Sequence, residues 1–137
     1  MFNAINTAGT GLTAYRTWID VIANNIANVN DESPTSTPAF EAQYVQAQPA
    51  AEGANGLGSG VEVTDLPRSG SPGLSVYEPN SPLADNNGMV RRPDIDMSEQ
   101  MGNLIVAQRA FQANANVVER AKDVYEAGIA IGKGMPS

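Results

Sequence analysis

The sequence contains no cysteine and no histidine, and these absences exclude several kinds of chemistry. Without cysteine there are no disulfide bridges, no zinc sites built on thiolates and no cysteine nucleophiles. Without histidine there is no Ser-His-Asp triad, and the commonest general base near neutral pH is missing. The 137 residues suffice for one ordinary domain but not for two. We therefore predict that the chain is not an enzyme and that it uses no cofactor, metal or small-molecule substrate.

Positive charge is also scarce. The chain has 8 Lys and Arg against 15 Asp and Glu, which gives a formal net charge of −7. The only adjacent basic pair is Arg91-Arg92, whereas a surface that follows a phosphate backbone needs clustered cations. We predict that neither nucleic acid nor an anionic membrane surface is a partner, and that the excess acid mainly aids solubility.

Long apolar runs are missing as well. No stretch approaches 18 consecutive apolar residues, so we expect no segment inserted in a membrane. The first residues, from Met1 to Thr7, have neither a basic region nor a continuous apolar core. They do not form a cleaved signal peptide. Export from the cytosol would have to depend on another signal.

Two apolar rows run through the first part of the chain at a spacing of seven residues. They consist of Ile5, Leu12, Ile19 and Ile26, and of Ala8, Tyr15, Ile22 and Val29. This heptad pattern predicts a helix from about Asn3 to about Asn28, with a polar face that includes Asn24 and Asn25. Two glycines and four threonines weaken the helix in isolation. Its order should therefore come from packing against other elements.

The last part of the chain has a second heptad pattern. Its first row is Met97, Leu104, Phe111, Val118 and Tyr125; its second row is Met101, Gln108, Ala115, Lys122 and Ile129. The pattern predicts a helix from near Asp96 to near Gly132, with Asp96 and Glu99 as its N-terminal cap. The two polar residues of the second row either fix the register or lie at the edge of the seam. Further apolar residues widen the stripe, which indicates contact with more than one neighbour.

The middle of the chain is rich in turn-forming residues. Alternation predicts a strand at 60–66, with a less regular strand at 40–45 and a short one at 74–77. The Asn87-Gly88 turn allows Met89 to Arg91 to fold back, and 49–59 reads as a loop. We predict a mainly α fold in which N- and C-terminal helices pair as a coiled coil, with a small β-hairpin module and extended loops between them. Residues 1–30 and 94–137 would form one helical domain, joined by a linker and β module at 31–93.

Three motifs resemble a phosphate-binding loop, a calcium loop and a catalytic carboxylate pair, but each has a structural interpretation. The glycine-rich residues 56–60 precede a strand, whereas a phosphate-binding loop opens a helix. Residues 85–88 fail the calcium-loop pattern and read as a turn. Asp94 and Asp96 are spaced like a carboxylate pair, but helix capping explains Asp96. The apolar rows themselves could form the private core of a helical hairpin, although the unequal helix lengths favour assembly with other chains.

Three stretches carry a resemblance to a known family. Residues 22–30 read IANNIANVN, which resembles the N-terminal signature of the bacterial flagellar axial proteins. Residues 77–90 and 93–96, YEPNSPLADNNGMV and PDID, resemble the segment that precedes the C-terminal helix in the proximal rod subunits of that family, the rod protein C branch. Residues 110–114, AFQAN, resemble the family's C-terminal helix. The acidic, proline-containing run at 31–38 departs from the shorter, more basic run of most members.

The resemblance implies a structural subunit of the proximal rod of the flagellar basal body. Such a subunit forms part of the drive shaft that transmits torque and encloses the export channel. Its partners would be copies of itself and other rod subunits in a helical assembly, together with the flagellar type III export apparatus. Helices that order only on assembly would suit export of the unfolded chain. The alternative function is a coiled-coil adaptor or export chaperone that is not itself a filament subunit.

The signature asparagines Asn24, Asn25 and Asn28 lie together near the end of the first helix. Their side-chain amides can bond a neighbouring backbone or cap the helix. We hypothesise that they form hydrogen bonds between subunits. The simpler alternative is that they only terminate the helix.

Overall fold

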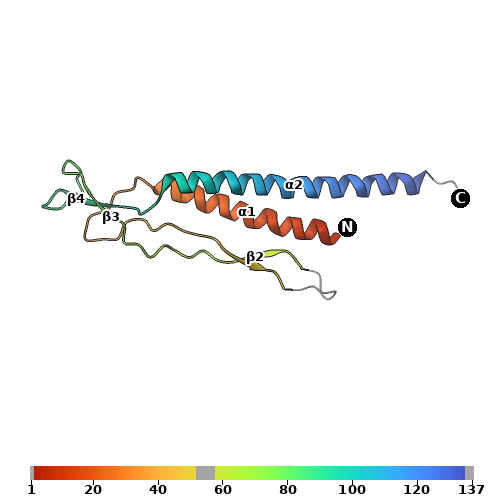
Figure 1. Cartoon of the computed structure of the whole chain (residues 1–137), viewed down its shortest axis with the longest axis horizontal. Helices are drawn as coiled ribbons and strands as arrows, with labels where there is room; N and C mark the ends of the chain where they lie inside the picture. The colour runs from red at the N-terminus through yellow and green to blue at the C-terminus, as the bar shows by residue number, and fades with distance from the viewer. Residues whose placement is uncertain (1, 52–57, 135–137) are drawn as a thin grey trace.

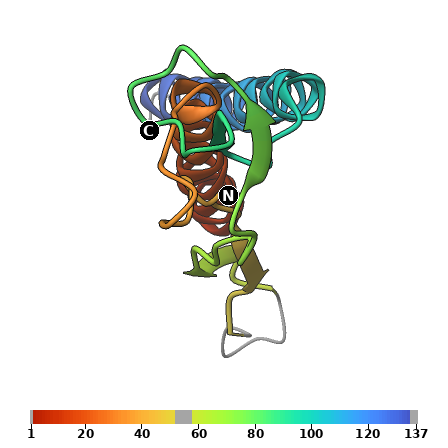
Figure 2. The ribbon, with the colours of Figure 1, turned by 90° about the vertical axis from the view of Figure 1, so that its left-hand side faces the viewer.

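The computed structural model describes residues 2–51 and 58–134, which form two long helices and two antiparallel hairpins (Figure 1). Helix α1 spans Phe2–Asn28 and helix α2 spans Met97–Lys133. The two helices pack side by side, as the views in Figures 1 and 2 agree. This confirms the predicted pair of terminal helices, close to their predicted bounds, whereas their winding as a coiled coil stays a prediction.

Two contacts show that α1 and α2 run in opposite directions. Asn25, near the end of α1, donates a hydrogen bond to Gln100, near the start of α2. Earlier in α1, a Cβ on Gly11 would lie 3.1 Å from the amide nitrogen of Asn114. The buried core of this pair is made largely of small or medium side chains. It contains Ala8, Val21 and Ile22 from α1 and Ala107 from α2.

The strands form two separate hairpins. Strand β1 (Gln46–Pro49) pairs with β2 (Val61–Asp65), and β3 (Leu74–Tyr77) pairs with β4 (Met89–Arg92). The strands predicted at 60–66, 74–77 and 89–91 are confirmed, but the single predicted hairpin module is in fact two. The loop predicted at 49–59 falls partly on residues 52–57, which lie outside the described part of the chain and include the first two residues of the glycine motif at 56–60.

The strand predicted at 40–45 is wrong, because regular pairing begins only at Gln46. Residues 39–45 are extended, but their backbone bonds go to several different partners. Tyr44 N donates to the carbonyl oxygen of Pro67 over 2.9 Å, and Gln43 forms an isolated bridge with Arg68. Proline has no N–H to return a ladder hydrogen bond, so the opposite chain cannot continue a sheet here.

The first hairpin lies along the side of α1 away from α2 (Figures 1 and 2). Val61 N donates to Thr10 Oγ1 over 3.1 Å. The neighbouring Gly60 has a φ of +105°, and a Cβ there would collide with the Thr10 side chain. Glycine therefore permits this close approach of the hairpin to the helix.

The acidic run that follows α1 packs on the second hairpin through an ion cluster. Arg92 Nη2 lies 2.7 Å from Glu32 Oε1 and 3.2 Å from Glu78 Oε1. Ser81 donates to the other oxygen of Glu32 over 2.8 Å. The hydrogen bonds from Arg92 and Ser81 lower the pKa of the Glu32 carboxyl. The departure of 31–38 from the family pattern thus has a structural counterpart, since Glu32 ties this segment to β4.

The Asp85–Gly88 segment is a turn, as predicted. The Asp85 carboxylate accepts hydrogen bonds from Asn87 N at 2.8 Å and Met89 N at 3.0 Å. The bonds from Met89 and Asn87 lower the pKa of Asp85. Gly88 has a φ of +74°, a conformation that a side chain disfavours.

Candidate assembly surface

Helix α2 extends beyond the start of α1 (Figure 1). The first turns of α1 reach the level of Val117, which lines an open pocket together with Ala4, Ala8 and Asn114. From 122 to 133 every residue of α2 is exposed. At 1.5 Å per residue this overhang is about 18 Å long. This exposed stretch of helix is available to a partner.

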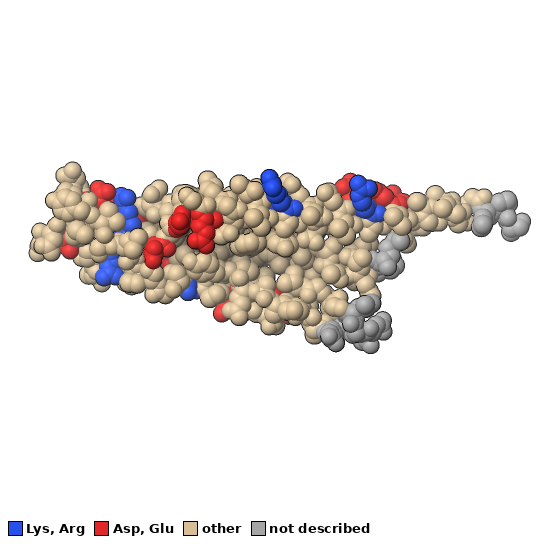
Figure 3. All heavy atoms as spheres, in the orientation of Figure 1, with Lys and Arg blue, Asp and Glu red and all other residues tan. Residues whose placement is uncertain are grey.

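One side of α2 carries a line of exposed large apolar residues, which we name the outer stripe. It consists of Val106, Val117, Val124 and Ile131, which are 56%, 48%, 58% and 68% exposed. The last three are spaced by seven residues, about two helical turns, and so lie above one another. On the face shown in Figure 3, the charged side chains gather in a few groups, and the surface between these groups along α2 is uncharged. Apolar surface in such a continuous line is typical of an interface.

The predicted rows of α2 are only partly directed at α1. In the first row, Leu104, Phe111 and Val118 are half-buried, whereas Met97 and Tyr125 at its ends are 36% and 47% exposed. Four members of the second predicted row are exposed in the single chain: Met101, Gln108, Lys122 and Ile129. Its role in contacts with neighbouring subunits stays a prediction. The covered companion row is instead Gln100, Ala107, Asn114 and Ala121. Small and polar residues fill it, and hydrophobicity alone did not reveal them.

The predicted rows of α1 face inward to different degrees. Ala8 and Ile22 are buried, at 6% and 2% exposure. The other members of the two rows are half-buried: Ile5, Leu12, Tyr15, Ile19, Ile26 and Val29. The α1 rows thus contribute to packing within the chain and keep part of their surface exposed. Their role as a seam between subunits stays a prediction.

Asn25 lies at the centre of a buried polar network. Its amide nitrogen donates to the Gln43 carbonyl oxygen at 2.8 Å and to Gln100 Oε1 at 3.1 Å, while its oxygen accepts from Gln43 N at 2.9 Å. Asn25 is 1% exposed and Gln100 is 4% exposed. The prediction that Asn25 lies on the polar face is therefore wrong, whereas a hydrogen bond to a neighbouring subunit stays a prediction. Its amide bonds α2 and the middle segment of its own chain.

The other two signature asparagines stay near the surface. Asn28 Nδ2 donates to the carbonyl oxygen of Asn24 at 2.8 Å and to its side-chain oxygen at 3.1 Å. Asn24 in turn donates to Gln43 Oε1 at 3.3 Å. Asn28 thus bonds the last turn of α1, which agrees with the helix-terminating alternative. A role of Asn24 and Asn28 between subunits stays a prediction.

The start of α2 is capped by Asp96, whose carboxylate accepts from Ser98 N at 2.8 Å and Glu99 N at 3.2 Å. Glu99 takes part through its backbone N–H, and its carboxylate lies in the first turn, where the helix dipole favours negative charge. The nearby Asp94 accepts a hydrogen bond from Ser71 at 3.2 Å. Each of these two aspartates therefore has a structural partner.

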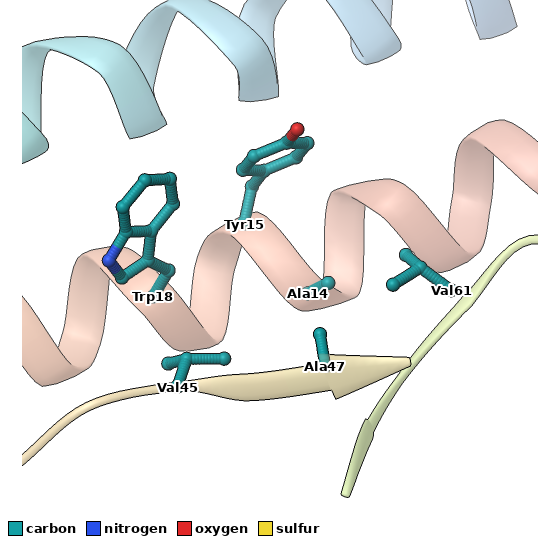
Figure 4. Close-up of a pocket in the computed structure, with 6 residues that line it drawn as sticks. All are labelled: Ala14, Tyr15, Trp18, Val45, Ala47 and Val61. Atoms are coloured by element: carbon teal, nitrogen blue, oxygen red, sulfur yellow. The ribbon is translucent and has the colours of Figure 1, made fainter. Parts of the chain in front are cut away.

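A second apolar hollow lies between α1 and the first hairpin (Figure 4). Its volume is about 340 Å³, and its lining consists of Ala14, Tyr15, Trp18, Val45, Ala47 and Val61. The rings of Tyr15 and Trp18 have centroids 6.2 Å apart. The hollow contains no titratable group that could serve as an acid or base at neutral pH.

Among residues 2–51 and 58–134, no three His, Cys, Asp or Glu side chains are gathered so that they could hold a metal ion. In the same part of the chain, neither helix is both long and apolar enough to cross a membrane.

Comparison with known proteins identifies the family. The profile of the family described as "Flagella basal body rod protein" matches residues 5–30, and that described as "Flagellar basal body rod FlgEFG protein C-terminal" matches residues 86–131. A protein named "Flagellar basal-body rod protein FlgC" from Borreliella burgdorferi is 33% identical, with 98% of this chain and 99% of the relative covered. The chain belongs to the FlgC family of flagellar basal-body rod proteins. Relatives of the same name support this assignment. The Escherichia coli protein is 35% identical, with 97% of this chain and 98% of the relative covered, and the Bacillus subtilis protein is 26% identical, with 96% and 98% covered.

Membership of the FlgC family makes the chain a structural component of the flagellar basal-body rod. It places the chain at the basal body, where it assembles with other rod components. The family is described as one of structural components of the rod. The two matched regions contain nearly all of α1 and of α2, so the family signal coincides with the two helices and with the exposed face of α2.

Proposed function

We propose that the chain is a subunit of the proximal rod, which forms part of the drive shaft that transmits torque and encloses the export channel. The observation that carries this proposal is the exposed end of α2 together with the outer stripe. Both are apolar surfaces on a rigid helix, and neighbouring subunits in a helical assembly would bury them.

In this proposal residues 1–30 and 94–137 act as one helical unit that pairs with neighbouring units as a coiled coil. The first rows of α1 and α2 serve the contact within the chain, and the outer stripe and the overhang serve contacts between chains. Copies of the chain and other rod subunits are the partners. The chain reaches the rod through the flagellar type III export apparatus, without a cleaved signal peptide.

The weak helix propensity of α1 supports export in an unfolded state. Gly9, Gly11 and four threonines lie in this helix, and the hydroxyls of Thr10, Thr13 and Thr17 bond back to carbonyls three or four residues earlier. Such residues lower the stability of an isolated helix. Helix formation would then be completed by packing in the rod.

The alternative function, a coiled-coil adaptor or export chaperone, differs in the state of the free chain. A rod subunit is expected to be a monomer at micromolar concentration in which the α1–α2 contact is formed. The exposed end of α2 should gain helix on assembly, because packing supplies much of the stability of a helix. An adaptor would be a stable, fully helical dimer. Sedimentation and circular dichroism of the purified full chain distinguish the two, and a sharply melting dimer would contradict the rod proposal.

A further inference from the structure

The apolar rows of the two helices do not by themselves define how far α1 lies along α2. Both patterns repeat every seven residues, so a shift of one heptad, about 10.5 Å, returns apolar residues to apolar residues. The shift toward the C-terminus of α2 is the more favourable one, because it would cover part of the exposed overhang. Something other than hydrophobicity must oppose it.

The observed register is specified by polarity and size along one line of contact. Asn25 meets Gln100, and fourteen residues away along both helices Gly11 meets Asn114. The constant spacing places Trp18 at the level of Ala107, halfway between them, and Ala107 is fully buried. At each of these three levels, a large or polar residue of one helix is matched with a small or polar residue of the other helix.

A shift of one heptad would break each of these matches. Asn25 would come to the level of Ala107, Trp18 to that of Asn114, and Gln100 would lose its amide partner. The network also holds the middle segment, because both backbone groups of Gln43 bond the Asn25 amide. Buried amides without partners oppose such a shift strongly, since each is desolvated and gains no hydrogen bond in return.

We propose that Asn25, Gln100 and the Gln43 backbone form a register pin, which holds α1 and α2 of one chain in a single alignment. The pin is a positioning device: a single polar contact in an apolar seam selects one pairing among several similar ones. In a rod that contains many identical helices, the register pin would favour pairing of α1 with the α2 of its own chain, because the Gln43 backbone that bonds Asn25 belongs to that chain. This last consequence rests on the proposed function, whereas the register within one chain does not.

Disulfide trapping measures the register directly, because the chain has no cysteine of its own. The alignment of Asn25 with Gln100 and of Gly11 with Asn114 puts Ala8 at the level of Val117, and both residues line one pocket. The pair Ala8→Cys with Val117→Cys is therefore designed to report the observed alignment. The pair Ala8→Cys with Val124→Cys reports the alignment shifted by one heptad. A disulfide requires Cα atoms within about 7 Å, which separates the two alignments. The ratio of the two disulfide yields reports the relative populations of the two alignments. It does not depend on the fraction of chains in which α1 and α2 are paired.

With the pin intact, we expect the first pair to cross-link at least about tenfold more than the second. The double substitution Asn25→Leu with Gln100→Leu should reduce this ratio to near one, because leucine fills the space without fixing the alignment. Exchange of the two side chains, Asn25→Gln with Gln100→Asn, should restore the preference. The matched control Asn24→Leu, at an exposed position of the same turn, should leave the ratio unchanged.

Three outcomes would overturn the register pin. The first is an unchanged ratio in the leucine pair, which would mean that the connecting segment alone sets the alignment. The second is the absence of any preference in the chain with the pin intact. The third is loss of both cross-links in the leucine pair, since the apolar rows are expected to hold the helices together without the pin. None of these outcomes bears on whether the chain is a rod subunit, which is tested by its assembly and location.

Discussion

Replacing Val124 and Ile131 by glutamate will abolish rod assembly while leaving the isolated chain as folded as before. Both side chains belong to the outer stripe and are 58% and 68% exposed, so the single chain loses little when they become polar. Glutamate is a good helix former, and α2 should keep its helical structure. In an assembly that buries the stripe, two lost apolar contacts weaken each subunit's binding by about 3 kcal/mol, more than a hundredfold.

The measurement is swimming motility and the yield of rod-containing basal bodies in a strain that carries only the variant. The matched control is Gln112→Glu with Asn116→Glu, which adds the same charge to exposed polar positions of the same helix. Circular dichroism of the purified chains checks that their folding is equal. Normal motility of the Val124→Glu, Ile131→Glu variant would show that the outer stripe is not an assembly contact.

Replacing Asn25 by alanine will destabilise the fold by about 2–4 kcal/mol, whereas the same change at the adjacent Asn24 will cost less than about 1 kcal/mol. The two side chains have the same chemistry and differ in their surroundings. Asn25 is 1% exposed and forms three hydrogen bonds, which link α1 to Gln43 and Gln100. Alanine would leave both backbone groups of Gln43 without these partners. Asn24 is exposed, and water can replace its bonds.

Urea unfolding followed by circular dichroism compares the two alanine variants with the parent chain. A lower midpoint for Asn25→Ala with an unchanged slope is the expected result. Equal midpoints for the two variants would mean that the buried network contributes nothing to stability. Because the loss arises within one chain, it should be present in the purified protein before any assembly.

The sequence pattern predicted the two helices because their signals are long and local. Seven-residue periodicity runs through both, and Asp96 marks the start of α2. The strands at 74–77 and 89–91 were also predictable, since the Asn87-Gly88 turn joins alternating segments. The strand at 40–45 was misplaced because its partner on the other side includes Pro67, and pairing with a residue far along the chain is not visible in local alternation.

The candidate surface was less predictable than the fold, because it depends on which side of α2 meets α1. Heptad spacing marks apolar residues such as Met101, which is exposed in the single chain, but it does not mark Ala107 and Asn114, which are covered. A close approach at Gly11 selects small partners, which carry little hydrophobic signal. The helical pattern also predicts Asn25 on the polar face, because asparagine is a polar residue. A buried amide is distinguished from an exposed one only by the partners that the fold brings to it.

The central claim, that the chain is built into the rod, is tested most directly by its location in purified basal bodies. Basal bodies isolated from cells with a tagged copy of the chain should be treated with detergent and salt, and the chain should then be quantified by mass spectrometry and located by immunogold labelling. The rod proposal predicts several copies per basal body, retained after washing and labelled along the rod. A chain that washes away, or is found only with the export apparatus in the cytosol, would contradict it and favour the adaptor.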